Sequence, residues 1–425
     1  MPTLRQPIWC IVAAYLVFLL SACGGGGGGT ATSPNNPVSP ALPGPSSNVI
    51  PISVDSQYYG GINIPYVSVT ICSPVNPTLC QTIDHITVDT GSSGLRILAS
   101  AISPALSNFP QQTTIASGGN PVAECMPYAL GYTWGSIRFA NIQIGSETVG
   151  NLAIQVISDP AVSTIPSACS GLGNPMNTGA SLGSNGLLGV GLFAQDCGSY
   201  CASGTNNQVY YGCSPSGCNN ILQTTANQLQ QPVSLFSKDN NGVIIAMNPI
   251  STPLTGQQTA SGTLTFGIDT QTNNASTNTN TLTADPTSGY ISTTFNNQLY
   301  PNSLMDTGSN AYFFTDSAIP SCATSGSRAA PGFYCPTSVL PFSAVATGVN
   351  NTSTTINFAV ANVANLYYNS PSSYAAFANL AGSGGTGTGA YSTFDWGLPF
   401  FYGRQVYVAI EGSTTSKGVG PYFGW

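Results

Sequence analysis

Short runs of β-branched and aromatic residues, separated by glycine, proline, asparagine and serine, make up most of the chain. Strands of soluble sheets have this composition, and turns take the residues between them. The pattern predicts strands within residues 52–70, 137–157, 242–247, 263–268 and 406–410. Patterns typical of helices are few, and the best of them cover residues 219–231 and 372–380. We therefore expect an all-β protein with few short helices.

A segment of low complexity divides the chain in two. Residues 270–283 are almost wholly Thr, Asn, Gln and Ser, a composition typical of linkers. We therefore expect an N-terminal β lobe at residues 49–270 and a C-terminal β lobe at residues 271–425. Both lengths lie in the range of single domains.

The first 48 residues have the features of a targeting segment followed by a tether. Arg5 precedes an apolar run and then small residues, which indicates a secretory signal peptide at residues 1–22. Residues 23–48 are rich in Gly, Pro, Ser, Thr and Asn and cannot bury a core. We expect them to form a flexible-to-extended tether before the folded part.

The end of this signal, Leu20-Ser21-Ala22-Cys23, resembles the lipobox of bacterial lipoproteins. The resemblance implies that Cys23 is lipidated and becomes the mature N-terminus; an ordinary signal with an incidental cysteine is the alternative. Gly24 follows the cysteine, and no aspartate does, which in Gram-negative lipoproteins resembles an outer-membrane address. We expect an exported protein anchored at the outer membrane, on its periplasmic side or at the cell surface, by this lipid only.

Charged residues make up only 5% of the 425 residues, and the net charge is −7. Without a basic patch the chain is unsuited to nucleic acid, and it has no attraction to anionic lipid heads. The single histidine, His85, excludes multi-histidine metal sites, and a structural or surface role is the simpler interpretation of it. We expect a monomer that needs neither a metal nor another cofactor.

Ten of the twelve cysteines follow the signal and its terminal Cys23, and this even number predicts disulfides in an exported chain. Cys72–Cys80 and Cys322–Cys335 are plausible local pairs, while the connectivity of the others stays open. Four cysteines gather in an insertion at residues 195–218, where their spacing also suits zinc. Export favours disulfides over zinc in this insertion.

Each predicted lobe contains Asp-Thr-Gly-Ser directly after an apolar strand, at residues 89–92 and again at residues 306–309. One such phrase indicates only a turn. Two of them, one per lobe, suggest a pair of facing carboxyl groups. Such a pair cannot ionise twice, so it holds one proton, as in the aspartic proteases. It can activate a water and protonate a carbonyl without a metal, a histidine or a covalent intermediate.

From about Val49 to Trp425 the chain resembles the pepsin-like aspartic peptidases. Beside the two motifs, segments at residues 185–191, 266–269 and 396–404 match further signatures of that family in the expected order. The amino-acid sequence of the last segment also resembles that of an uncharacterised bacterial family of exported pepsin-like lipoproteins. The resemblance implies a bilobal fold: two β-barrel-like lobes related by a pseudo-twofold axis, with a cleft between them.

The resemblance also assigns the site: Asp89 and Asp306 are the implied catalytic pair. Their implied supporting residues are Thr90, Gly91, Ser92, Thr307, Gly308 and Ser309. The threonines would bond across beneath the pair, and the serines would hydrogen-bond the outer carboxylate oxygens. The glycines would let the backbone approach the reacting water and peptide.

The family carries a tyrosine on a flap hairpin, and the spacing favours Tyr128, with Tyr132 second; an ordinary sheet aromatic is the alternative for either. Arg96 stands where the family has the tryptophan that bonds this tyrosine. It is a candidate partner of the flap, whose charge would lower the apparent pKa of the pair. A side chain directed to solvent is the alternative. Asn310 replaces the serine usual in the second lobe.

These features predict an aspartic endopeptidase that hydrolyses extended polypeptides in a cleft between two lobes. The alternative is a non-catalytic surface lipoprotein that keeps the fold to bind peptide or glycan. A narrower possibility is a peptidase that cleaves a single co-exported partner. The sequence leaves the substrate, the pH optimum and the role of the 195–218 insertion open.

Overall fold

The computed structural model describes residues 48–204, 206–276, 280–384 and 392–425. Strands dominate these residues, and the longest helix has seven residues. The prediction of an all-β chain with few short helices is therefore confirmed. The expected signal peptide, the lipidation site Cys23 and all of the expected tether except Asn48 lie outside the described residues.

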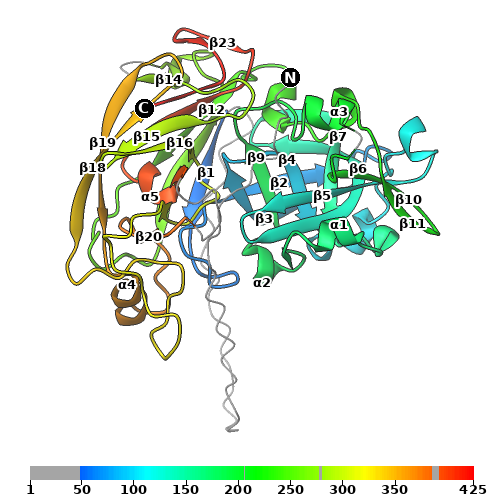
Figure 1. Ribbon diagram of the computed structural model, residues 1–425. Helices are drawn as coiled ribbons and strands as arrows, with labels where there is room; N and C mark the ends of the chain where they lie inside the picture. Colours follow the sequence, from blue (N-terminus) through cyan, green and yellow to red (C-terminus); the bar gives the residue numbers. More distant parts are fainter. Residues whose placement is uncertain (1–47, 205, 277–279, 385–391) are drawn as a thin grey trace, which may run out of the picture.

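Two large sheets form the molecule (Figure 1). The first has sixteen strands, in the order β11 (Gly217–Asn220), β10 (Tyr210–Ser214), β5 (Val122–Tyr128), β6 (Gly131–Ile144), β7 (Glu147–Ile157), β4 (Ser93–Leu98), β9 (Gly186–Val190), β3 (Cys80–Asp89), β2 (Tyr66–Cys72), β1 (Val49–Val54), β13 (Ala260–Phe266), β12 (Gly242–Met247), β22 (Gln405–Ala409), β25 (Tyr422–Gly424) and β14 (Thr281–Thr283), with β8 (Asn174–Pro175) beside β6.

The second sheet has seven strands, in the order β19 (Ser353–Val360), β18 (Leu340–Thr347), β15 (Ile291–Phe295), β16 (Gln298–Met305), β21 (Thr393–Trp396), β17 (Tyr312–Phe313) and β20 (Ala381–Gly382). A small pair, β23 (Thr414–Thr415) and β24 (Gly418–Val419), completes the strands. The α-helices are α1 (Ser167–Ser170), α2 (Gly179–Leu182), α3 (Ser199–Ser203), α4 (Val363–Asn369) and α5 (Leu398–Phe401).

The end of the chain returns to the first sheet. Strand β22 pairs with β12, and β25 then pairs with β22 and β14. In Figure 1 the end of the chain, marked C, lies near β14 on the left-hand side of the molecule. The two lobes therefore share a sheet, and this hydrogen-bonded connection fixes the position of one relative to the other.

The cores of the two lobes differ in composition. Ile and Val fill most buried positions of β1, β2 and β3, where the alternating pattern directs every second side chain inward. The second sheet instead packs aromatic rings on one another. Phe394 stacks on Phe314 at 4.6 Å between ring centroids and on Trp396 at 4.3 Å. This aromatic cluster supports β21, which runs beside the second Asp-Thr-Gly-Ser motif.

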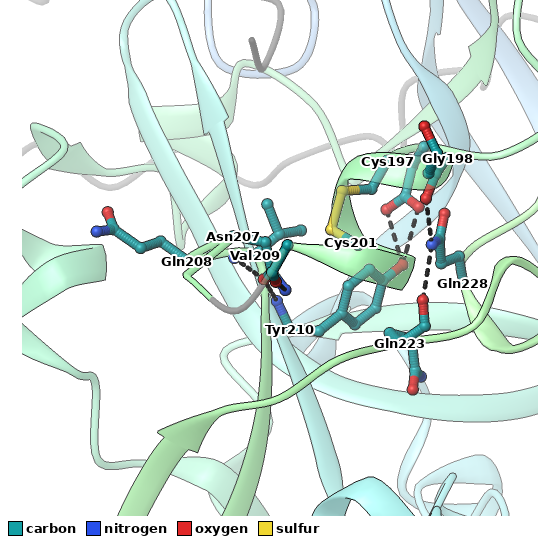
Figure 2. The surroundings of a disulfide bond; sticks show 12 residues. Cys197, Gly198, Cys201, Asn207, Gln208, Val209, Tyr210, Gln223 and Gln228 are labelled. Atoms are coloured by element: carbon teal, nitrogen blue, oxygen red, sulfur yellow. Dashed lines mark hydrogen bonds between the residues drawn. A yellow bond between two sulfur atoms is a disulfide. The ribbon is translucent and has the colours of Figure 1, made fainter. Parts of the chain in front are cut away.

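The predictions of helices at residues 219–231 and 372–380 are wrong. The first range holds the end of β11 and a short 3-10 turn at Thr225–Asn227, and the second range holds no α-helix. In the first range, amide side chains form hydrogen bonds with backbone carbonyls outside any helix. Gln228 donates to the carbonyls of Gly198 and Gln223 (Figure 2). Such side-chain bonds compete with helix formation.

All ten cysteines of the described residues form disulfides, as predicted. The two expected local pairs, Cys72–Cys80 and Cys322–Cys335, are confirmed. The other pairs are Cys125–Cys169, Cys197–Cys201 and Cys213–Cys218. The four cysteines of the 195–218 insertion are thus paired, and Figure 2 shows Cys197–Cys201 beside Tyr210. Five disulfides are typical of a protein outside the cytoplasm. In the part of the chain that the structure describes, no helix could cross a membrane.

Candidate active site

The two Asp-Thr-Gly-Ser motifs occupy matching places in the two sheets. Asp89 is the last residue of β3, and Asp306 directly follows β16. Each of these strands runs parallel to a buried neighbour, β9 in the first sheet and β21 in the second. Both carboxyl groups are buried: Asp89 is 5% exposed and Asp306 is 3% exposed. The strands therefore deliver two carboxyl groups to the junction of the lobes.

Thr90 and Thr307 bond across that junction. The amide of Thr90 donates to Oγ1 of Thr307 at 3.1 Å, and the amide of Thr307 donates to Oγ1 of Thr90 at 2.9 Å. Each hydroxyl in turn donates to a carbonyl of the opposite lobe, Thr90 to Met305 and Thr307 to Val88. All four contacts are buried. The two turns are therefore held to each other by a closed, symmetric set of hydrogen bonds.

The glycines bring each turn against the opposite carboxyl group. A Cβ on Gly91 would lie 2.9 Å from Cγ of Asp306, and one on Gly308 would lie 2.7 Å from Oδ1 of Asp89. Real Cβ atoms do not approach other atoms so closely, so any side chain there would push the pair apart. Each glycine amide also donates to the Oδ1 of the aspartate two residues before it.

The serines contact the other carboxyl oxygens. Ser92 donates to Oδ2 of Asp89, and Ser309 lies 3.0 Å from Oδ2 of Asp306. Ser309 has a second partner: its Oγ lies 2.5 Å from Oδ2 of Asp395, a residue of β21. All eight residues implied by the resemblance, the pair and its six supporting residues, thus lie together at one junction.

Asp395 is the residue that sequence reasoning missed. It is 2% exposed, and burial raises its pKa to about 8 although the hydrogen bond from Ser309 lowers it. Burial and the charges of Asp89 and Asp395 raise the pKa of Asp306 well above its usual range. The one available signal was a single carboxyl inside the otherwise apolar stretch of residues 393–401.

Two cavities open beside the pair. One is lined by Asp89, Asp306 and apolar side chains of the first lobe, among them Leu130, Met176 and Leu187. The other begins at the Thr90–Ser93 turn and reaches the Cys-rich insertion: its walls include Leu192, Phe193, Cys197, Tyr200, Val209 and Tyr290. Tyr128 lines both cavities. The pair therefore lines one of two cavities that share this tyrosine, and we refer to the two cavities together as the groove.

The two flap candidates lie in different surroundings. Tyr128 ends β5, and its register partner Gly131 begins β6, so the tyrosine stands at the tip of a hairpin. Tyr132 lies on β6, is 4% exposed and packs in a core cluster with Trp134 and Cys125. It lines neither cavity. The position beside the carboxyl pair thus belongs to Tyr128.

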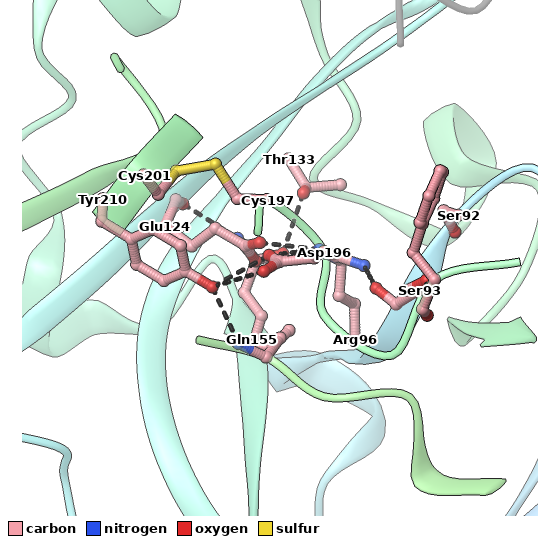
Figure 3. A network of polar contacts seen from close by, with 12 residues as sticks. Ser92, Ser93, Arg96, Glu124, Thr133, Gln155, Asp196, Cys197, Cys201 and Tyr210 are labelled. Atoms are coloured by element: carbon pink, nitrogen blue, oxygen red, sulfur yellow. Dashed lines mark hydrogen bonds and ion pairs between the residues drawn. A yellow bond between two sulfur atoms is a disulfide. The ribbon is translucent and has the colours of Figure 1, made fainter. Parts of the chain in front are cut away.

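Arg96 is fully buried, which rules out the solvent-directed alternative. Its Nε and Nη2 donate to Glu124 at 3.1 and 2.6 Å, and Nη2 also lies 3.2 Å from Asp196 (Figure 3). Nη1 donates to the carbonyl of Ser93. Burial would lower the pKa of Arg96, but the charges of Glu124, Tyr128 and Asp196 raise it well above its usual value. Arg96 is therefore a permanent cation among buried carboxyl groups.

One guanidinium faces two acids in this network. Burial and the charge of Glu124 raise the pKa of Asp196 well above its usual range, although the charge of Arg96 lowers it. The hydroxyl of Tyr210 lies 2.9 Å from both oxygens of Asp196. Because Asp196 belongs to the 195–218 insertion and Glu124 to β5, the network joins the insertion to the base of the flap hairpin (Figure 3).

The remaining chemistry of the described residues is sparse. They include no group of three or more histidine, cysteine, aspartate or glutamate side chains placed to hold a metal ion. His85 lies 3.3 Å from Asp55 and stacks on Tyr58, and it lines neither cavity. What the junction offers is two close carboxyl groups, held by reciprocal bonds and open to a groove, which suits general acid–base chemistry on a water.

The comparisons with other proteins name one family. The model of a family described as "Protein of unknown function (DUF3443)" matches residues 44–425. A search of curated proteins found no match. Among solved structures, the chain is similar to the crystal structure of an aspartic proteinase from Irpex lacteus, with 16% identity and a TM-score of 0.48 over 88% of this chain and 96% of that one. Since the family model covers nearly the whole chain, the protein belongs to the DUF3443 family.

Proposed function

We propose that this protein is an aspartic endopeptidase that hydrolyses extended polypeptides with a water held between Asp89 and Asp306. The observation that carries the proposal is the interlocked junction of the two turns. Each glycine abuts the opposite carboxyl group, and each threonine bonds the opposite turn. A turn that served only the fold would not need to bring two buried carboxyl groups into each other's field.

The pair divides the chemistry because it carries one proton. Burial and the neighbouring charges raise the pKa of Asp306, which supports Asp306 as the proton-holding member, although in such a pair the proton belongs to both. The ionised carboxylate takes a proton from water as its oxygen attacks the peptide carbonyl carbon. The protonated carboxyl gives its proton to the carbonyl oxygen, which yields a neutral gem-diol.

Collapse of the gem-diol returns the site to its first state. One hydroxyl of the diol gives its proton back to one carboxylate as the carbonyl re-forms. The other carboxyl protonates the nitrogen, so that the amine leaves neutral. The pair again holds one proton, and no metal or covalent intermediate takes part.

The groove supports a peptide as the substrate. Its two cavities lie on either side of Tyr128, and the side chains that line them are largely apolar. A chain laid through the groove would place one side chain in each cavity and a peptide bond at the carboxyl pair. Apolar walls favour apolar side chains, because their burial removes surface from water. The proposed partner is therefore a polypeptide with apolar residues around the cleaved bond.

Export and lipid anchoring are part of the same proposal. The five disulfides support a place outside the cytoplasm. The lipobox-like segment supports a lipid on Cys23 and attachment to the outer membrane. Replacing Cys23 with Ser should release the protein from the membrane fraction. A Cys23→Ser protein that stays in the outer membrane would refute the lipid anchor.

The test of activity is cleavage of denatured casein between pH 3 and 8, with and without pepstatin. Asp89→Asn and Asp306→Asn should each lower kcat/KM by about 1000-fold or more, because each removes one member of a single unit. The control is Asp84→Asn, since that side chain is 59% exposed and lies outside the groove. Undiminished cleavage by either variant would overturn the assignment. Peptide binding without cleavage by the wild type would favour the non-catalytic alternative.

A further inference from the structure

The second lobe places a third carboxyl group beside the pair. Strands β9 and β21 occupy equivalent places, each parallel to the strand that leads to an aspartate. Leu187 on β9 is in register with Thr87, two residues before Asp89. Asp395 on β21 is in register with Leu304, two residues before Asp306. The pseudo-twofold counterpart of Asp395 is therefore an apolar leucine.

The surroundings of Asp395 offer it no cation. Its register partners on the neighbouring strands are Leu304 on β16 and Phe313 on β17, neither of which titrates. The charged groups that act on it are Asp89 and Asp306. Among the described residues, no salt bridge reaches any of these three carboxyl groups. Oδ1 of Asp395 has no hydrogen-bond partner there, and Oδ2 contacts Ser309.

The hydroxyl of Ser309 decides where protons must lie. It has one hydrogen, yet Oδ2 of Asp306 lies 3.0 Å away and Oδ2 of Asp395 lies 2.5 Å away. It can donate to one of them and must accept from the other, so one of the two carboxyl groups carries a proton toward it. Asp306 also accepts a hydrogen bond from the amide of Gly308, whereas Oδ1 of Asp395 has no donor. A buried carboxylate with fewer donors and no cation costs more free energy, which favours the proton on Asp395. Ser92, its counterpart in the first lobe, serves Asp89 without such a second acid.

We propose that Asp395 is a positioning residue whose carboxyl group stays protonated. Its O–H donates a hydrogen bond to Ser309, so that the hydroxyl of Ser309 donates in turn to Asp306. The catalytic part of this inference rests on the proposed function; the proton on Asp395 does not. While Asp395 is neutral, Asp306 keeps one outer hydrogen bond. When Asp395 ionises, Ser309 turns to it, and Asp306 loses a donor and gains a negative neighbour. The ionisation of Asp395 therefore sets the alkaline limit of activity, because Asp306 no longer has the hydrogen bond that the reaction needs.

The first experiment measures the proton without any activity. With a pKa of about 8, folded Asp395 keeps a proton that the unfolded chain releases near pH 4, so stability falls as pH rises between these values. Asp395→Asn removes this titration while the amide can still donate to Ser309. We expect the fall in Tm from pH 5 to 8.5 to shrink by about 2 °C or more. The control is Asp316→Asn, which should leave the fall unchanged, because Asp316 accepts hydrogen bonds from Asn296 and from the amide of Ala318.

An equal fall in the wild type and in Asp395→Asn would overturn the inference. If that variant does not fold, the infrared carbonyl band of protonated carboxyl groups in the wild type decides. At pH 6.5 the spectrum should contain the band of a buried protonated carboxyl in addition to those of the pair and of Asp196, whose pKa is also raised. It should titrate away toward pH 9. A spectrum without this additional band would likewise overturn the inference.

The second experiment follows kcat/KM against pH for a casein-derived peptide. Asp395→Asn should move the alkaline limb upward by about one pH unit, and Asp395→Leu should lower kcat about tenfold below Asp395→Asn at pH 6, with KM changed less than twofold. Suppose that the wild type cleaves the peptide, but Asp395→Asn changes neither the alkaline limb of the kcat/KM profile nor the fall in Tm. The inference about Asp395 is then wrong, and the proposed function stands. If nothing is cleaved but the Tm fall shrinks, the proposed function fails and the third proton stands.

Discussion

The two lobes present the same turn but place their buried ionisable group on opposite strands. In the first lobe Arg96 on β4 lies in register with Leu187 on β9. In the second lobe Phe313 on β17 lies in register with Asp395 on β21. Each lobe thus pairs one ionisable residue with one apolar residue at the equivalent position. The ionisable residue lies on β4 in the first lobe, but in the second lobe it lies on β21, the equivalent of β9.

The reversal teaches that only the atoms facing the carboxyl pair must match between the lobes. The threonine bonds and the glycine contacts are nearly symmetric, because each acts on the opposite lobe. One layer further out, the first lobe compensates a buried cation with the carboxyl groups of Glu124 and Asp196 (Figure 3). The second lobe compensates a buried acid with a proton. The same turn is therefore supported by charge pairing on one side and by neutralisation on the other.

The largest effect should come from Arg96→Met in the first lobe. It leaves Glu124 buried without its cation, which should lower the free energy of unfolding by about 3–5 kcal/mol. Urea unfolding measures the loss. The matched control is Arg328→Met in the second lobe, an exposed arginine that bonds Asn365 and Asn369, with a loss below about 1 kcal/mol. Equal losses would show that the first lobe does not depend on its buried cation.

The threonine bonds test the symmetric part of the comparison. Thr90→Val and Thr307→Val each remove one donor to a carbonyl and one acceptor of an amide, and each should cost about 1–3 kcal/mol. The double variant should cost less than the sum, because each hydroxyl accepts from the amide of the other residue, so the loss of one already loosens the turn that holds the other. Thr82→Val, which breaks an exposed bond to Thr70, is the control. If the two single variants lose clearly different amounts of unfolding free energy, the two threonines do not contribute equally to the junction.

The proposed flap is the hairpin of β5 and β6 in the first lobe, and its two candidate tyrosines should differ in their effect on activity. Tyr128→Phe should lower kcat/KM about tenfold, near 1.4 kcal/mol, because Tyr128 lines both cavities beside the pair. Tyr132→Phe keeps the core packing and should change kcat/KM less than twofold. This prediction rests on the proposed function. A silent Tyr128→Phe beside an impaired Tyr132→Phe would reverse the assignment.

The smallest effect concerns His85, a partly exposed titrating group of the first lobe that faces opposite charge. Burial would lower its pKa, but Asp55 raises it, so its contribution to stability is full below pH 6.5 and is lost as pH rises through the raised pKa. Asp55 has a lowered pKa despite burial, so the pair also weakens in strong acid. His85→Gln should cost up to about 1 kcal/mol at pH 5.5 and less at pH 8.5. The same loss at both pH values would contradict the ion pair.

Much of the fold was predictable because it rests on local patterns. The predicted strands at residues 242–247 and 406–410 coincide with β12 and β22, whose β-branched residues alternate or run continuously as buried strands require. Cys72–Cys80 and Cys322–Cys335 followed from short spacing. The prediction of a helix at residues 219–231 failed because Gln228 bonds the carbonyl of Gly198, 30 residues away, which only folding brings near.

The sequence by itself determined the strands, the two turns and the residues placed directly after them, since turn chemistry and strand periodicity act over a few residues. Only the tertiary structure decided that Arg96 is buried against Asp196, 100 residues away, and that Ser309 is shared with Asp395, 86 residues away. Such contacts depend on strand register and burial, which fix the side chains that meet in the dry interior. Burial then sets the protons and charges there, and no property of the isolated residues carries that information.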